Sequence, residues 1–226
     1  SKTEGYPIYR NSNFDYYPLG DLGYPIMLEE MKKAEKFIFL EYFTIEKGNL
    51  WEGMHTILKD KVAQGLDVRV MYDDMGTIHS LPTSYANMLE SEGIKCVRYN
   101  KINPFLGAVM NHRDHRKIMV IDGTVAFSGG MNLADEYINQ KMVFGHWKDN
   151  VIRVKGEAVW SYTVLFLTNW NAIRKTDDDY TVFKVDSVTQ HTDGYISPYG
   201  ETPFDGENTG QNIYMNILNR ANEYVY

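Results

Sequence analysis

The sequence predicts an α/β sandwich with a largely parallel or mixed sheet flanked by helices. Helix-like and strand-like segments alternate from residue 24 to residue 100, as they do in sandwiches of this class. The chain has 226 residues, of which 43% are hydrophobic and 14% aromatic, so it can bury a substantial core without disulfides. Its single cysteine, Cys96, has no intrachain partner and is expected to be a buried strand thiol.

The first half of the chain contains three helix–strand units. Apolar residues recur at helical spacing in each helical segment, and Gly65 and Gly93 end the second and third helices. The segments between them are rich in β-branched and aromatic residues, as buried strands are. We therefore expect helices at 24–36, 49–65 and 81–93, followed by strands at 37–44, 67–74 and 94–100.

The second half begins with a strand that starts near His115 and ends at Asp122. A further strand is expected at 149–156 and a long, strongly apolar helix at 157–173. The chain then becomes rich in Asp, Thr, Gly and Pro, which is typical of a connection.

The end of the chain repeats part of its beginning. The segment ANEYVY at 221–226 matches AEKFIF at 34–39, and a helical segment precedes both. We therefore predict a first domain at 1–173, a connecting segment at 174–208, and the start of a second, truncated domain at 209–226. Since there is no initiator Met or signal-like segment, both ends are expected to be artificial boundaries within a longer protein.

Charge and hydropathy exclude several classes of protein. The net charge of -7 would repel a polyphosphate backbone, so general nucleic-acid binding is disfavoured. The apolar runs are interrupted or shorter than the ~20 residues that cross a bilayer. We therefore expect this piece itself to be soluble.

The most informative stretch is NHRDHRKIMVIDGTVAFSGGMN, at 111–132. His115 and Lys117 alternate along a strand and so project on the same side. A histidine nitrogen can attack phosphorus, and a nearby lysine can neutralise the non-bridging oxygens, without a metal. Asn132 can donate its amide to the same oxygens, and Gly129 and Gly130 allow a close backbone approach.

Other uses of these residues stay open on the sequence alone. His112 and Asp114 can form a metal pair, and the cationic cluster can be only an anion-binding surface. Glu41, Asp73 and Asp74 lie at strand ends, where they can be solvated or capping carboxylates or a weak Mg²⁺ site.

Two further types of residue have two readings each. Arg113 and Arg116 add positive potential for an anionic headgroup or pair with nearby acids. Trp147 and Trp170 are expected in the core rather than in contact with lipid.

The full spacing of His115, Lys117, Asp122, the glycine pair and Asn132 resembles the HKD signature of the phospholipase D superfamily. Together with the segments GGMNLADEY and HWKDN, it is similar to the first catalytic half of bacterial cardiolipin synthases. The resemblance runs from about Tyr24 to the end of the chain. It implies a phospholipase D-like α/β sandwich with a mixed sheet, in which two such halves share one cleft.

The resemblance also implies roles for five residues. His115 is the nucleophile or the general acid for the leaving alkoxide, and Lys117 and Asn132 bind the phosphate. Asp122 belongs to the motif, but its odd separation from His115 directs it to the opposite face, so a turn-fixing role is expected. Asp149 matches the acidic position that orients the histidine ring.

The function implied is that of a phosphatidyltransferase that makes cardiolipin and glycerol from two phosphatidylglycerol molecules through a phosphohistidine. The alternative is a phospholipase D or a phosphodiesterase or nuclease that uses the same residues for hydrolysis. No cofactor, metal or nucleic acid is implied. The partners implied are phosphatidylglycerol, the second HKD half of the same chain, and the bacterial cell membrane through transmembrane segments absent from this piece. Without the second half, the piece is expected to be inactive.

Overall fold

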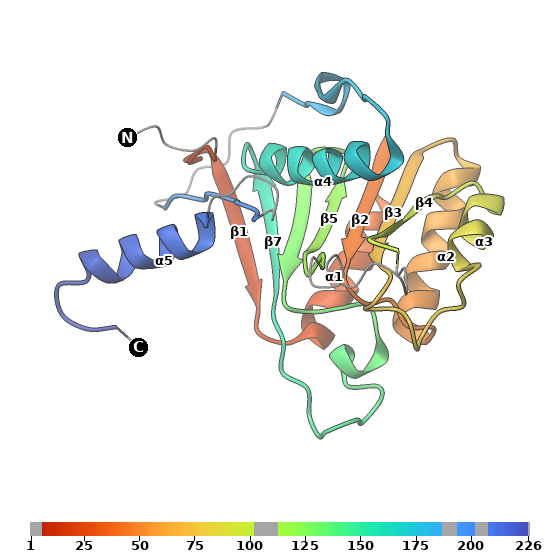
Figure 1. Ribbon diagram of the computed structural model, residues 1–226, viewed down its shortest axis with the longest axis horizontal. Helices are drawn as coiled ribbons and strands as arrows, with labels where there is room; N and C mark the ends of the chain where they lie inside the picture. Colours follow the sequence, from red (N-terminus) through yellow and green to blue (C-terminus); the bar gives the residue numbers. More distant parts are fainter. Residues whose placement is uncertain (1–5, 102–112, 187–193, 202–207, 226) are drawn as a thin grey trace.

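A seven-stranded mixed sheet forms the centre of the computed structural model, which describes residues 6–101, 113–186, 194–201 and 208–225 (Figure 1). The strand order is β1-β7-β6-β5-β2-β3-β4. Neighbours β2, β3 and β4 run parallel, and the other neighbouring pairs run antiparallel. The strands are β1 Ser12–Tyr17, β2 Phe37–Tyr42, β3 Asp67–Asp73, β4 Lys95–Tyr99, β5 Lys117–Ile121, β6 Val125–Gly129 and β7 Val151–Gly156. This arrangement confirms the predicted α/β class with a mixed sheet.

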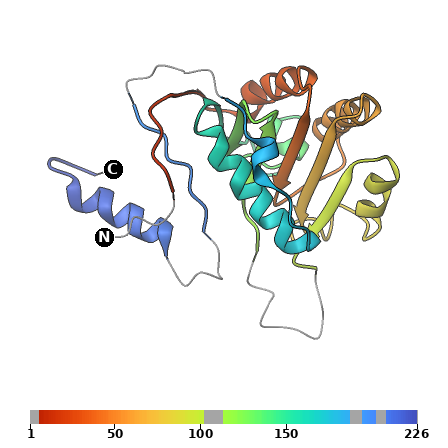
Figure 2. The same cartoon turned by 90° about the horizontal axis from the view of Figure 1, so that it is seen from above.

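Helices cover both faces of the sheet (Figure 2). One face carries three helices, and the long helix α4 crosses the other. The bounds are α1 Gly20–Lys32, α2 Asn49–Ala63, α3 Tyr85–Ser91, η2 Asp135–Ile138, α4 Val159–Arg174, η3 Tyr180–Phe183 and α5 Thr209–Arg220. None of the helices in the described part of the chain is long and apolar enough to cross a bilayer.

Strand β5 contributes to both cores because all of its residues are buried. Met119 and Ile121 pack with α1 and α2, whereas Ile118 and Val120 pack with α4. Burial on both faces explains why the residues of this strand form a continuous apolar run and do not alternate between apolar and polar. The predicted buried thiol of Cys96, 4% exposed, and the predicted core position of Trp170, 2% exposed, are confirmed.

Some elements differ from those expected. α1 begins four residues earlier than expected, at Gly20, and contains Pro25 inside the helix. Strands β1 and β6 were not predicted. The strand expected at 221–226 is absent from the described residues 221–225, where no neighbouring strand pairs with the backbone, so this prediction is wrong for those residues. Helix α5 does form, and most of its side chains are exposed.

The β5–β6 hairpin turns at Asp122 and Gly123, which have φ angles of 53° and 68°. An Asp-Gly pair with positive φ at both positions is favoured in tight hairpin turns. The Asp122 carboxylate also accepts hydrogen bonds from the backbone amides of Glu35, Lys36 and Phe37, at 2.7, 2.8 and 2.8 Å. Asp122 therefore joins the hairpin to the start of β2.

We predict that Asp122→Ala lowers the free energy of unfolding by about 2 to 4 kcal/mol, since three amides lose a charged acceptor. Asp122→Asn, which keeps an acceptor oxygen, should lose less than half of that amount. Urea unfolding of the two variants measures both values. A loss below about 0.5 kcal/mol in the alanine variant would show that the contacts contribute little.

Candidate functional site

Several of the candidate residues predicted from the sequence lie along one edge of the sheet. The strand ends at Tyr42, Asp73 and Gly129 meet the strand starts at Lys117 and Val151 at this edge, as the pairing register requires. His115 comes just before β5. The fold therefore brings together residues that are far apart in the sequence.

Lys117 is held in a nearly dry position, 6% exposed. Its Nζ donates to the backbone carbonyl of His115 at 2.6 Å and lies 5.4 Å from the centre of the Phe43 ring. Burial lowers the pKa of Lys117 to about 8, although the charges of Asp114 and Asp149 act in the opposite direction. At neutral pH the ammonium is still mostly protonated, and it is poorly solvated, so an anion would be a strongly favoured partner.

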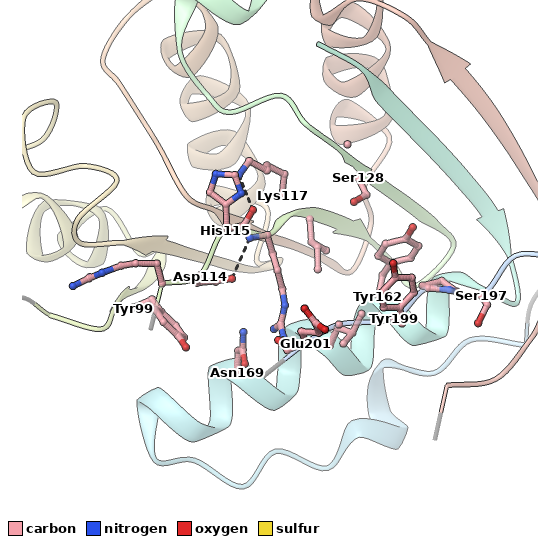
Figure 3. A pocket seen from close by; sticks show the side chains of 17 residues that line it. Tyr99, Asp114, His115, Lys117, Ser128, Tyr162, Asn169, Ser197, Tyr199 and Glu201 are labelled. Atoms are coloured by element: carbon pink, nitrogen blue, oxygen red, sulfur yellow. Dashed lines mark hydrogen bonds between the residues drawn. The ribbon is translucent and has the colours of Figure 1, made fainter. Parts of the chain in front are cut away.

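His115 reaches solvent beside this lysine (Figure 3). Its ring packs against Phe43, with 4.9 Å between the ring centres. Desolvation of the ring and then the charge of Lys117 lower the pKa of His115, while Asp114 and Asp73 oppose the shift. The imidazole is therefore neutral at neutral pH, which is the form that can attack an electrophile.

A buried carboxylate fixes the segment that carries His115. Asp73 is 0% exposed and accepts from the backbone amide of Asp114 at 3.0 Å. It also accepts from the amides of Met75 and Gly76, at 2.8 and 3.2 Å. Asp73 therefore acts as a capping carboxylate that joins the end of β3 to the residue before His115.

A second buried acid, Glu41, lies beside Asp114. Glu41 is 0% exposed, and its Oε1 accepts from Asn169 at 2.8 Å and from Arg116 at 3.4 Å. Burial and then the charge of Asp114 raise the pKa of Glu41 well above its usual range. The second carboxylate oxygens of Glu41 and Asp114 are both buried and have no hydrogen-bond partner among the described residues. The raised pKa favours the protonated form of Glu41, whose proton can then be shared with the neighbouring Asp114 carboxylate.

The two arginines of the motif pair with these acids. Arg113 Nη1 lies 3.5 Å from Asp73 and donates to the carbonyl of Asn100 at 3.1 Å. Arg116 also donates to the carbonyl of Glu201, at 2.7 Å. Both arginines therefore pair with acids, one of the two roles considered for them, and both also line a cavity.

The cavity opens beside His115, mainly on the α4 side of the sheet, and measures about 530 Å³ (Figure 3). Segment 113–118 forms one wall, and Tyr162, Leu165 and Asn169 of α4 form another. Segment 197–201 closes a further side. Its volume lies within the range of about 300 to 1,000 Å³ that is usual for small-molecule sites.

Asn132 is near this edge but is held by the protein. It is 4% exposed, its Oδ1 accepts from the amide of Thr44 at 3.1 Å, and its Nδ2 donates to the hydroxyl of Tyr137 at 2.8 Å. One amide hydrogen remains for a ligand. Neither Phe43 nor Tyr137 was singled out from the sequence, where nothing distinguishes them from core aromatic residues.

Asp149 is close to Lys117 rather than hydrogen-bonded to His115. It raises the pKa of Lys117, and its Oδ1 accepts from the amide of Asn150 at 2.9 Å. Among the described contacts, none joins Asp149 to the His115 ring, and the acids whose charges act on that ring are Asp114 and Asp73. The orienting role implied for Asp149 is therefore not formed in this structure.

The remaining candidates lie elsewhere or have other contacts. Asp122 follows β5 at the end opposite Lys117, roughly 16 Å away along the strand, so it does not reach the site. Asp74 pairs with Arg98 at 3.0 Å. His112 falls outside the described residues. Within the described ranges, no cluster of three or more His, Cys, Asp or Glu is placed to hold a metal ion.

Solved structures share this fold. NucT from Helicobacter pylori aligns with a TM-score of 0.56 at 13% identity, over 72% of this chain and 98% of its own. Nuc from Salmonella typhimurium, a phospholipase D family member, aligns with a TM-score of 0.52 at 16% identity, over 73% and 95%. The fold is therefore phospholipase D-like.

The sequence comparisons show the family. Residues 27–160 match the family model described as cardiolipin synthase, PLD-like domain, and the chain belongs to this family. An uncharacterized protein of Streptococcus mutans is 45% identical over all of this chain and 49% of its own length. A cardiolipin synthase of Oceanobacillus iheyensis is 32% identical over 96% of this chain and 45% of its own. The chain thus spans about half the length of these relatives.

We predict a pH dependence of stability from the buried acid pair. The pKa of Glu41 is raised in the folded state. Its protonated form therefore contributes to the free energy of unfolding fully below the ordinary carboxyl pKa, and this contribution is lost as the pH rises towards the folded-state pKa. The wild type should therefore lose up to about 1.4 kcal/mol per pH unit in that window relative to Glu41→Gln, which keeps the contacts without an ionisable proton.

Urea unfolding between pH 5 and pH 8 measures this difference. Glu52→Gln, at an exposed position of α2, is the matched control and should follow the wild type. Parallel pH profiles of the wild type and Glu41→Gln would contradict a protonated Glu41.

Proposed function

We propose that this chain is the first catalytic half of a phosphatidyltransferase that makes cardiolipin and glycerol from two phosphatidylglycerol molecules. The observation that carries the proposal is the placement of a neutral, accessible His115 next to the desolvated ammonium of Lys117. The family match over residues 27–160 supports this choice of reaction. In the full-length protein we place the site at the bacterial cell membrane.

The chemistry needs a nucleophile and an acid on opposite sides of one phosphorus. An imidazole nitrogen attacks phosphorus, the bond from phosphorus to the glycerol oxygen breaks, and a second histidine protonates the leaving alkoxide. The hydroxyl of another phosphatidylglycerol then attacks, the phosphorus–nitrogen bond breaks, and the second histidine takes the proton. His115 supplies one of the two groups, and we propose that a second HKD half of a longer protein supplies the other.

Lys117 and Asn132 are proposed to bind the non-bridging oxygens of the phosphate. Lys117 gives up its bond to the His115 carbonyl, and Asn132 uses its remaining amide hydrogen. Removing one preorganised donor to a developing charge typically raises the barrier by roughly 3 to 4 kcal/mol. Asp149 lies where it can partly balance the charge of Lys117 between turnovers.

Hydrolysis of a phosphodiester, as in a phospholipase D or nuclease, is the second candidate. It would use the same residues with water as the acceptor, and the solvent exposure of His115 favours it. The two reactions differ in product, because only transfer to a second phosphatidylglycerol forms cardiolipin. The acidic net charge of -7 supports a lipid over a nucleic acid.

We predict that Lys117→Ala in the full-length protein lowers turnover of phosphatidylglycerol by about 100-fold to 1000-fold, without a matching loss of stability. Asn132→Asp should have a similar effect, because it keeps an acceptor for the Thr44 amide but replaces the donor with a charge that repels phosphate. Cardiolipin, phosphatidic acid and glycerol are separated and quantified from mixed micelles.

Lys32→Ala, an exposed position on α1, is the control and should retain full turnover. Near-wild-type turnover in Lys117→Ala would remove the assigned role. Phosphatidic acid as the main product would show that the protein hydrolyses phosphatidylglycerol instead of transferring its phosphatidyl group.

A further inference from the structure

The connection between η2 and β7, residues 139–150, extends beyond the sheet edge that carries His115 and Lys117 (Figure 1). It leaves from the end of η2 and returns at Val151, which pairs with Gly129 at that same edge. We call residues 141–148 the apolar loop. The candidate active site uses none of its side chains.

The tip of the apolar loop exposes large hydrophobic side chains. Met142 and Phe144 are 86% and 89% exposed, and Val143 is 43% exposed. Gly145, with a φ angle of 115°, makes the turn, and a Cβ placed there would meet nothing within 4 Å. Exposing several such neighbouring side chains to water is unfavourable unless they have a partner.

The base of the apolar loop is fixed, so its tip has a defined position. The amide of Trp147 donates to Asn139 Oδ1 at 2.7 Å, and Asn139 Nδ2 donates back to the carbonyl of Trp147 at 3.1 Å. The centre of the Trp147 ring lies 5.1 Å from the centre of the Tyr137 ring. The Tyr137 hydroxyl accepts a hydrogen bond from Asn132 Nδ2. Trp147 is half-buried rather than part of the core proper. These contacts link the base of the loop to the candidate phosphate ligands.

The charge of the apolar loop differs from that of the whole chain. Residues 138–148 include Lys141, His146 and Lys148 and contain no Asp or Glu, although the chain has a net charge of -7. Lys141 pairs with Glu46, while Lys148 is exposed. Apolar side chains flanked by lysines are suited to a surface that is apolar inside and anionic outside.

We propose that the apolar loop inserts into the headgroup layer of an anionic lipid bilayer. Met142 and Phe144 enter the acyl boundary, Lys148 meets anionic headgroups, and Trp147 lies at the interface, where indole rings are favoured. Because the loop and His115 share one sheet edge, insertion turns the candidate site towards the headgroups. A protein partner fits less well, since the apolar area is a narrow tip rather than a flat patch.

The inference goes beyond the proposed reaction, because binding to a bilayer is measured without turnover. The 226-residue chain is sedimented with vesicles of phosphatidylcholine containing 30% phosphatidylglycerol, and with vesicles of phosphatidylcholine alone. We expect the wild type to bind the anionic vesicles and to be released by salt. The double variant Met142→Ser/Phe144→Ser should bind at least tenfold more weakly, and Lys148→Gln should weaken binding only to the anionic vesicles.

Two controls separate the apolar loop from other exposed apolar residues. Phe14→Ser, on β1, changes a phenylalanine that is 56% exposed, and Ile217→Ser changes a residue of α5 that is 63% exposed. Both should bind like the wild type. Failure of the wild type to bind, full binding by the loop variant, or loss of binding in Ile217→Ser instead would overturn the proposal.

A label at the tip tests insertion directly. The only cysteine, Cys96, is buried, so Val143→Cys can be labelled selectively with an environment-sensitive dye. Its emission should shift to the blue with anionic vesicles, whereas a dye at Val182→Cys, 71% exposed on η3, should not respond. A shift caused by self-association without vesicles would identify a second copy of the chain as the occupant and contradict the proposal.

Discussion

The hydrogen bond from the Asp114 amide to the buried Asp73 carboxylate is the contact on which the candidate site depends. It attaches the segment before β5 to the end of β3, although β5 pairs with β2 and not with β3. Glu41 of β2 contacts the same segment through Arg116, at 3.4 Å. Between these two buried acids, His115 has little freedom to leave the sheet edge, and Lys117 begins the strand with its ammonium against the His115 carbonyl.

The same arrangement sets the electrostatics of the site. The charges of Asp114 and Asp73 favour a protonated His115. Desolvation and Lys117 have the larger effect on its pKa and keep the ring neutral. Lys117 in turn keeps most of its charge because Asp114 and Asp149 offset part of the cost of burial. A neutral nucleophile next to a poorly solvated cation is an arrangement that stabilises charge on a phosphate only when the substrate is present.

Much of the fold could be predicted from the sequence, because the alternation of periodic helices and apolar strands is a local signal. The spacing of His115, Lys117 and Asn132 was also visible. β1 and β6 were missed, since β1 is a half-exposed edge strand and β6 runs directly into the glycine pair. The pairing of Glu41 with Asp114 depends on strand neighbours far apart in the sequence, so no local pattern indicates it. Among the described contacts, none joins Asp149 to the His115 ring, and the charge of Asp149 acts on Lys117 instead.

The central claim is that the site presents a neutral histidine whose pKa is lowered by desolvation and by Lys117. Titration of His115 followed by NMR tests this claim most directly. The signal is assigned by its loss in His115→Gln. The account predicts a midpoint below the ordinary histidine value of about 6.5, a higher midpoint in Lys117→Ala, and a rise on adding sulfate that Lys117→Ala abolishes. A wild-type midpoint at or above the ordinary value, unchanged by Lys117→Ala and by sulfate, would contradict it.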